Sequence, residues 1–337
     1  MSIVIETENL SRTYKTYDKP EGLWESVRGF WARKYTEKVA LAPTTLKIES
    51  GQIIGLVGAN GAGKTTLLKM LSGLIHPSTG SARVLGFEPW KRDNRYLRRM
   101  SILLGQKNQL WWDISPIDSF SLLMEIYDLN REDAKKRVAM LAEMLECTHV
   151  LHTQLRRLSL GERMKMEIIG SLLHSPDVLF LDEPTIGLDI IAQTTIRKFL
   201  GDYVRDKGPT VILTSHYMDD IAKLADRLLL ISKGSIVYDG TVNAFITNAK
   251  SALKISFGLS NPLENSMPLT LDAILDKGQQ EFSVKVMAEE LAPALSKITS
   301  LPGVLDLKIE EADFEDIIRA FLEKESRVLS TRSPHES

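Results

Sequence analysis

The chain has 337 residues, of which 43% are hydrophobic and 26% are charged, an ordinary composition for a globular protein with a full core. Its formal net charge of −2 gives no general reason to expect nucleic acid as a partner. The single cysteine, Cys147, cannot form an internal disulfide, which indicates a reducing compartment. It lies in the apolar helical pattern Met140–Val150, which predicts a small core residue. No secretory leader pattern occurs at the N-terminus, and no apolar run approaches the roughly 18 residues that span a bilayer, so we expect a soluble chain.

The first predicted element is a strand that begins at Ile3 and ends at Tyr14. An insertion over residues 15–38 follows it, and an amphipathic helix is predicted there at about residues 20–36. Its apolar positions recur at spacings of three and four: Leu23, Trp24, Val27, Phe30, Trp31 and Tyr35. This helix either docks on its own domain or faces a membrane or a membrane partner, where aromatic and basic residues suit the interface.

A glycine-rich stretch at Gly58–Thr66 is the strongest local signal. The apolar run Ile53–Val57 before it predicts a buried strand, and Thr65–Leu71 after it predicts a helix. A strand, a loop and a helix in this order are the context that the phosphate-binding pattern G-x-x-x-x-G-K-[ST] requires.

The residue types in this loop suit a nucleoside triphosphate. Gly58 and Gly63 occupy the fixed glycines of the pattern, so the backbone can curl until successive N–H groups face a phosphate. Lys64 is expected to reach the β- and γ-phosphates, and Thr65 to place its hydroxyl on Mg²⁺.

A second strong signal is the apolar strand Asp177–Leu181, which leads into Asp182 and Glu183. A strand that ends in an acid delivers a carboxylate to the carboxyl edge of a parallel sheet, beside the phosphate loop. We expect Asp182 to hold Mg²⁺ and Glu183 to polarise the attacking water.

Three single residues are ambiguous by themselves. Gln106, after the predicted strand Met100–Leu104, is either a surface amide or a contact to Mg²⁺ or water. His216 is either a structural histidine or a contact to the γ-phosphate, and Asp189 is either a helix N-cap or a bridge to a second subunit.

Ser159 and the N–H of Gly161 stand at the start of a predicted helix and form a second potential anion site. One phosphate loop suffices to hold ATP, so the second site is most useful if it closes over a nucleotide held by another copy. A largely helical stretch is predicted over Ile117–Val150, with Asn130 as an N-cap, and buried strands at Thr210–Leu213 and Arg227–Ile231.

The composition shifts after Gly240. Strands are predicted at Leu253–Phe257, Glu281–Met287 and Leu305–Ile309, with helices at Ala288–Ile298 and Asp313–Lys324. We expect a small α+β module at residues 241–325 and a disordered tail at 326–337.

These motifs, in this order, resemble the ATPase subunit of ATP-binding-cassette (ABC) transporters over about residues 3–240. The resemblance implies an α/β P-loop NTPase fold with a catalytic RecA-like lobe and a helical lobe at about residues 115–175. The matching motifs are the Walker A loop (Gly58–Thr65), the glutamine loop (Gln106), the signature (Leu158–Glu162), Walker B (Val178–Asp182), the D-loop (Gly187–Asp189) and the switch histidine (His216).

The resemblance also implies site residues. Glu183, His216 and Gln106 would be catalytic, and Thr65, Gln106 and Asp182 would hold Mg²⁺. The nucleotide contacts would come from Tyr14, stacked on adenine, and from Gly58, Asn60, Gly61, Ala62, Gly63, Lys64, Thr65, Thr66, Ser159, Gly161, Glu162 and Asp189.

The implied partners are a second copy or a paralogous ATPase, in a head-to-tail dimer around two ATP molecules, and an integral membrane permease on whose cytoplasmic side the chain would sit. Two features narrow the family. The insertion is similar to the extra helix of polysaccharide-export ATPases, and the stretch Gly105–Asp113 is similar to type-2 exporter ATPases, so export is favoured. A soluble ABC protein that acts on ribosomes or DNA is the alternative.

The signature departs from Leu-Ser-Gly-Gly-Gln at Leu160 and Glu162, and the glutamate adds a negative charge near the nucleotide. Trp111 and Trp112 follow the glutamine loop, where the family's permease docks. They are either core residues or the docking surface.

Overall fold

The computed structural model describes residues 2–17, 35–105, 108–249, 252–260, 273–275, 281–287, 290–301, 303–311 and 314–331. These residues belong to two compact units, Met1–Gly240 and Thr241–Ser337. Most of the helix predicted at about 20–36, as well as Gln106, lies outside the described residues.

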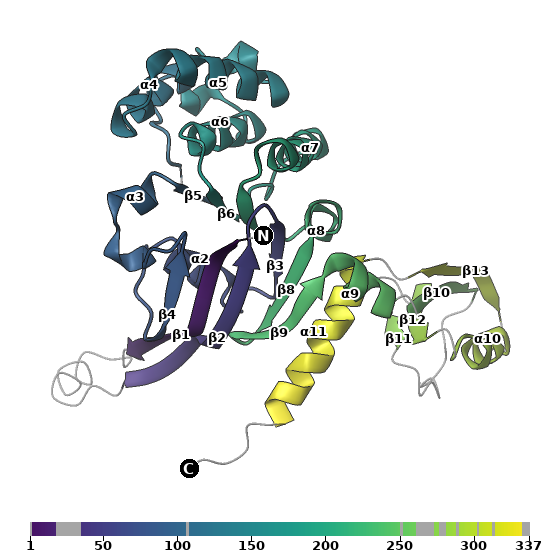
Figure 1. Ribbon diagram of the computed structural model, residues 1–337. Helices are drawn as coiled ribbons and strands as arrows, with labels where there is room; N and C mark the ends of the chain where they lie inside the picture. Colours follow the sequence, from purple (N-terminus) through teal and green to yellow (C-terminus); the bar gives the residue numbers. More distant parts are fainter. Residues whose placement is uncertain are drawn as a thin grey trace, which may run out of the picture. The chain divides into compact units, whose positions relative to one another are not determined.

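A six-stranded sheet is the frame of the first unit, with the strand order β5-β6-β7-β3-β8-β9 (Figure 1). Its neighbours from β5 to β8 pair in parallel. The strands β3, β6 and β7 are buried at every position, as continuous apolar runs in a sheet covered on both faces require. The strands are β3 (Ile53–Val57), β5 (Met100–Leu104), β6 (Val178–Asp182), β7 (Thr210–Thr214), β8 (Arg227–Ser232) and β9 (Ser235–Thr241).

An antiparallel three-stranded sheet packs over helix α2 (Lys64–Leu71), with the order β2-β1-β4. Its strands are β1 (Ile3–Tyr17), β2 (Tyr35–Glu49) and β4 (Thr79–Val84). Side chains of both sheets and of α2 share one apolar core, which includes Ile5, Leu68 and Ile231. This core fixes the helix that follows the glycine-rich loop.

The structure corrects two predicted boundaries in this sheet. Strand β1 does not end at Tyr14 but continues to Tyr17, which pairs with Tyr35 of β2. Tyr35 and Thr36 were predicted as the end of a helix, yet they begin strand β2. Cross-strand pairing of these β-favouring residues therefore outweighs the helical spacing of the apolar positions.

Three helices, α4 (Pro116–Ile126), α5 (Arg131–Met144) and α6 (Leu160–Leu172), form the predicted helical lobe, which lies beyond the ends of β5 and β6 (Figure 1). Asn130 caps α5 as predicted, because its side chain accepts hydrogen bonds from the N–H groups of Glu132 and Asp133. Cys147 is buried as predicted, and burial raises the pKa of its thiol to about 12. An inert structural cysteine fits these facts.

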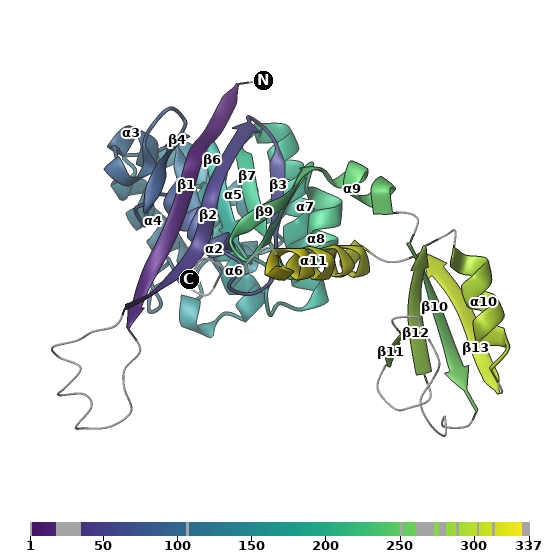
Figure 2. The same cartoon turned by 90° about the horizontal axis from the view of Figure 1, so that it is seen from below.

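Further turns and helices, one of them 18 residues long, complete the described part of the first unit (Figure 2). They are the turns η1 (Pro89–Lys91), η2 (Thr148–Val150) and η3 (Leu155–Arg157) and the helices α3 (Asn94–Leu97), α7 (Ile190–Lys207) and α8 (Met218–Leu224). Helices α7 and α8 follow strands β6 and β7, so their first residues lie at the carboxyl edge of the main sheet.

The second unit is an α+β module whose strands pair in the order β11-β12-β10-β13. Its core includes Ile255, Phe257, Val284 and Ile298. Its elements are α9 (Val242–Ala249), β10 (Ala252–Leu259), β11 (Ala273–Leu275), β12 (Glu281–Met287), α10 (Leu291–Thr299), β13 (Val304–Glu311) and α11 (Phe314–Thr331).

Helix α11 is longer than predicted, so residues 326–331 are helical rather than part of a disordered tail. The sequence explains this, because Val328 and Leu329 continue the helical spacing of Phe321 and Leu322. Within the described part of the chain, no helix has the length and apolar character to cross a membrane.

Candidate functional site

Four parallel strands bring the predicted site residues to one edge of the main sheet. In register, Leu104 of β5 pairs with Asp182 of β6, which pairs with Thr214 of β7. Thr214 in turn lies beside Leu56, near the end of β3. The carboxyl ends of neighbouring parallel strands therefore meet where the glycine-rich loop begins, as expected of a ligand site in an α/β sheet.

The glycine-rich loop closes tightly over the end of β3. A Cβ atom at Gly58 would lie 2.2 Å from the carbonyl oxygen of Ile231, and one at Gly63 would lie 2.4 Å from that of Ala40. Gly63 also has a φ of 114°, which residues with a side chain rarely adopt. Any other residue at these two positions would displace the backbone that cradles the ligand.

Lys64 bridges this loop from the first turn of α2. Its ammonium donates hydrogen bonds to the carbonyl oxygens of Gly58, at 2.7 Å, and Ala59, at 3.2 Å. Burial lowers the pKa of the ammonium, and the nearby carboxylates of Glu183 and Asp182 offset part of that effect. An ammonium carries three protons, so one donor remains for an anion placed over the helix N-terminus.

Asp182 is the centre of a hydrogen-bonded cluster at the strand ends. One of its carboxylate oxygens accepts from the Thr65 hydroxyl at 2.9 Å, and the other accepts from the Thr214 hydroxyl at 2.7 Å. The residue is 9% exposed. The sequence motifs assign no role to Thr214, although its place at the end of a buried strand that leads to His216 is a signal that could have revealed it.

Glu183 and His216 face each other as a pair. The imidazole Nε2 lies 2.8 Å from a carboxylate oxygen of Glu183. Glu183 has a φ of 56°, which is uncommon for a residue with a side chain, and its N–H donates to both the carbonyl and the hydroxyl of Thr214. The backbone of Glu183 is thus held by β7, the strand that also delivers His216.

Thr65, Asp182, Glu183 and His216 share one cavity of about 440 Å³, bounded by Asn60, Gly61, Thr65, Lys69, Leu104, Gly105, Asp182, Glu183, Ile186 and His216. Residues of the predicted glycine-rich loop, the predicted Mg²⁺ ligand Asp182 and the predicted catalytic residues Glu183 and His216 therefore all line the same cavity. Gln106 follows Gly105 but lies outside the described residues, so its predicted role remains a prediction. Lys69 was not predicted, although it follows the motif by one helical turn.

The oxygen atoms of Thr65 and Asp182 suit Mg²⁺. Mg²⁺ is bound in nucleotide sites by one or two carboxylates together with substrate phosphates and water. In the described ranges, no group of three or more acidic, histidine or cysteine residues is arranged to hold a metal ion by itself. A hydroxyl and a carboxylate at 2.9 Å from each other, beside a phosphate-binding loop, match this donor set.

The second predicted anion site lies at the start of α6 and does not line this cavity. Ser159 caps the helix and forms a reciprocal pair with Glu162. The N–H and the hydroxyl of Ser159 both donate to the Glu162 carboxylate, at 2.9 and 2.8 Å, and the N–H of Glu162 donates to the Ser159 hydroxyl. These hydrogen bonds to Ser159 are the main cause of the lowered pKa of Glu162. The pattern S-x-x-E predicts such a capping box, so the sequence already held this signal.

The D-loop residue Asp189 is the N-cap of α7, where its carboxylate accepts from the N–H of Ala192 at 2.8 Å. Its carboxylate lies next to the signature, because a Cβ atom at Gly161 would come within 3.8 Å of the Asp189 Oδ2. Its predicted bridging role remains a prediction. Tyr14 lies on β1 with the Arg12 guanidinium 4.6 Å from its ring centre, and it does not line the cavity.

Trp111 and Trp112 are on the surface, with exposed fractions of 42% and 41%, so the alternative that both are core residues is wrong. Two side chains of helix α6, which begins in the signature, contact the segment that carries these tryptophans. Buried Glu167 accepts hydrogen bonds from the N–H groups of Gln109 and Leu110, and the guanidinium of Arg163 stacks 5.0 Å from the Trp112 ring.

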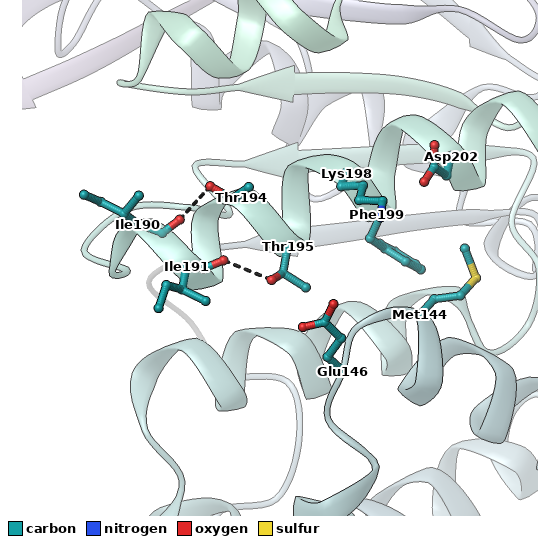
Figure 3. A pocket seen from close by; sticks show the side chains of 9 residues that line it. All are labelled: Met144, Glu146, Ile190, Ile191, Thr194, Thr195, Lys198, Phe199 and Asp202. Carbon is teal, nitrogen blue, oxygen red and sulfur yellow. Dashed lines mark hydrogen bonds between the residues drawn. The ribbon is translucent and has the colours of Figure 1, made fainter.

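A second cavity of about 470 Å³ lies between the end of α5 and the first turns of α7 (Figure 3). Ile190 and Ile191 at its mouth are 80% and 77% exposed. Its walls hold no glycine-rich loop and no group from the sheet edge, so the phosphate chemistry belongs to the smaller cavity.

Comparison with known proteins is consistent with this site. A family model described as "ABC transporter" matches residues 41–186. The ABC transporter ATP-binding protein NatA of Bacillus subtilis is 31% identical over 229 residues, which cover 68% of this chain and 92% of NatA. The Nod factor export ATP-binding protein I of Burkholderia orbicola is 31% identical over 214 residues, which cover 64% of this chain and 70% of that protein.

A similar solved structure is the dimeric post-hydrolysis state of the ATP-binding cassette MJ0796 bound to ADP and Pi. It aligns with a TM-score of 0.59 and 21% identity, over 71% of this chain and 98% of that one. At this identity the likeness supports the fold.

Proposed function

The chain belongs to the ABC transporter family, and on this premise we propose that it binds and hydrolyses ATP to drive a separate membrane permease. The observation that carries the proposal is the convergence of Thr65, Asp182, Glu183 and His216 on one cavity, beside the loop that Lys64 bridges. A phosphate cradle, a metal acid and a base beside a histidine are the parts that phosphoryl transfer to water requires.

Each residue has a distinct task in the proposed reaction. The loop N–H groups and Lys64 bind the β- and γ-phosphates, and Thr65 and Asp182 hold Mg²⁺, which neutralises charge on the phosphates when bound. Glu183 accepts a proton from water while the water oxygen bonds to the γ-phosphorus. The bond from that phosphorus to the ADP oxygen breaks, which releases ADP and phosphate. His216 orients Glu183 and contacts the γ-phosphate.

The proposal is tested by measuring phosphate release from ATP by the purified full-length chain with and without Mg²⁺. We expect Mg²⁺-dependent turnover. ATP bound without any turnover, alone or with a co-purified permease, would contradict the assignment of an ATPase.

A head-to-tail dimer completes the proposed site. Ser159 and Gly161 lie away from the cavity of their own chain, so they can serve the nucleotide held by a second copy. The dimeric state described for the MJ0796 cassette is consistent with this arrangement. In the single chain the Ser159 hydroxyl donates to Glu162, so donation to a γ-phosphate requires it to leave that carboxylate.

Replacing Glu162 with glutamine should strengthen ATP-driven dimerisation. Glutamine at this helix position can still cap α6, but the negative charge beside Ser159 disappears. A unit charge near the phosphate at a partly exposed site contributes ~1 kcal/mol, so the ATP concentration for half-maximal dimer should fall about fivefold. Analytical ultracentrifugation over an ATP titration measures it.

The matched control for this change is Glu143→Gln, which removes an exposed carboxylate from α5. It should leave the ATP titration unchanged. If Glu162→Gln weakened ATP-driven dimerisation, or gave the same ATP titration as Glu143→Gln, the charge of Glu162 would not oppose dimer formation.

We propose further that the surface of Trp111 and Trp112 contacts a cytoplasmic helix of the permease, which would place the chain at the membrane through that partner. Two exposed aromatic rings on a helix-supported loop fit the aromatic enrichment of protein interfaces. Similarity to a Nod factor export protein favours an exporter.

Trp112→Ala should reduce permease-stimulated ATP hydrolysis by a factor of about 10 or more, as loss of an interfacial aromatic anchor does. Basal hydrolysis and ATP affinity should not change, because Trp112 lies outside the cavity. Leu74→Ala, which trims a similarly exposed apolar side chain, is the control. Full stimulation of the Trp112 variant in reconstituted vesicles would disprove the docking surface.

A further inference from the structure

A buried carboxylate outside the cavity joins the two segments that carry Glu183 and His216. The Asp220 side chain on α8 is 2% exposed. One of its oxygens accepts from the hydroxyls of Thr185, at 2.6 Å, and Ser215, at 2.9 Å. The other accepts from two nitrogens of the Arg197 guanidinium, at 2.8 and 2.6 Å.

Two of these hydrogen-bonding partners lie close in sequence to the proposed catalytic residues. Thr185 comes two residues after Glu183, and Ser215 comes immediately before His216. Ser215 and Thr185 are each 3% exposed, so water does not compete for their hydroxyls. The Ser215 hydroxyl also accepts from the N–H of Tyr217, which fixes the backbone on both sides of His216.

Arg197 adds a third segment to the cluster. It belongs to α7, which begins at the D-loop residue Asp189. The Asp220 carboxylate thus accepts hydrogen bonds from three segments: the one after Glu183, the one around His216, and helix α7. A network whose members are all hydrogen-bonded in a dry interior holds its parts rigidly.

The backbone of Glu183 needs such support. Its φ of 56° is sparsely populated by residues with side chains and persists only where the surroundings hold it. Thr214 holds the N–H of Glu183 from one side, and the Thr185–Asp220 bond holds the chain from the other.

We propose that Asp220 is a positioning residue that sets the 2.8 Å contact between Glu183 and His216 through Thr185 and Ser215. The inference rests on the proposed ATPase function of that pair. Asp220 touches neither the nucleotide site nor the water, and it acts through the two hydroxyls.

The hydroxyls are better test positions than Asp220 itself. Changing Asp220 leaves the Arg197 guanidinium, whose side chain is only 15% exposed, without its counter-charge, and such a variant can fail to fold. Thr185→Val keeps the branched shape and Ser215→Ala is small, and both keep the ion pair intact. Ser171→Ala is the matched control, because it removes another buried hydroxyl, bonded to the Ile168 carbonyl within α6.

In the full-length chain we expect Thr185→Val and Ser215→Ala each to lower kcat about tenfold, since small displacements of reacting groups cost up to about a hundredfold. KM for ATP and Tm should remain near those of the wild type and of Ser171→Ala. The ¹⁵N chemical shifts of the His216 ring should move toward those of an imidazole without a carboxylate partner.

Unchanged kcat with unchanged His216 shifts in both variants would overturn the proposal. So would a loss of activity that simply follows a lower Tm, or a rise in KM alone. If the wild-type chain bound ATP without hydrolysing it, the proposed function would fail, yet the His216 shifts would still decide the positioning role of the cluster.

Discussion

Glu183→Gln should lower the rate of ATP hydrolysis by a factor of about 100 to 10,000, the range that a general base contributes. Glutamine has nearly the shape of glutamate and can still contact His216 at the distance of 2.8 Å, but it cannot take a proton from water. ATP affinity should be retained, because Lys64 and the loop N–H groups are untouched. Single-turnover hydrolysis measured beside equilibrium ATP binding separates the two effects.

Asp219→Asn is the matched control for this change. It neutralises an exposed acid on α8, three residues after His216, which pairs with Lys223. It should hydrolyse ATP at the wild-type rate. If hydrolysis survived Glu183→Gln within a factor of a few, the base would have to be another group and the catalytic assignment would be wrong.

Lys64→Ala should weaken ATP binding by a factor of about 10 to 100, since it removes a charge-assisted hydrogen bond to the phosphates. The loss extends to the loop, because the ammonium also joins the carbonyls of Gly58 and Ala59. Without a bound γ-phosphate, a second copy has nothing to close over, so ATP-driven dimerisation should be lost together with turnover.

Calorimetric titration with ATP and sedimentation of the same samples test this expectation. Lys91→Ala, which removes an exposed lysine paired with Glu88, should behave as the wild type does. If Lys64→Ala still dimerised on addition of ATP, loop occupancy would not control closure.

Much of the site can be predicted from the sequence because its signals are local. The loop at Gly58–Thr66 requires its glycines for steric reasons that apply to any chain, and an apolar strand that ends in Asp182 reaches the same sheet edge through parallel pairing. The strands β3, β5 and β12 have the predicted bounds for the same reason, since continuous or alternating apolar runs bounded by turns define them.

What the sequence does not reveal depends on contacts between distant residues. Arg197 and Asp220 are ordinary charged residues of two helices until the fold buries them against each other and against Thr185. The extension of the first hairpin to Tyr17 and Tyr35 likewise depends on cross-strand pairing. The capping box of Ser159 and Glu162 was accessible from its spacing, yet the glutamate was interpreted only by its charge.

We propose that this chain binds ATP as one half of an intermolecular clamp. The most direct test is the mass and ATP content of Glu183→Gln with saturating Mg²⁺ and ATP, measured by light scattering with nucleotide quantification. We expect twice the 37.8 kDa mass of one chain, with one ATP per chain, and a return to the monomer after Ser159→Arg. A monomer that is fully loaded with ATP would contradict it.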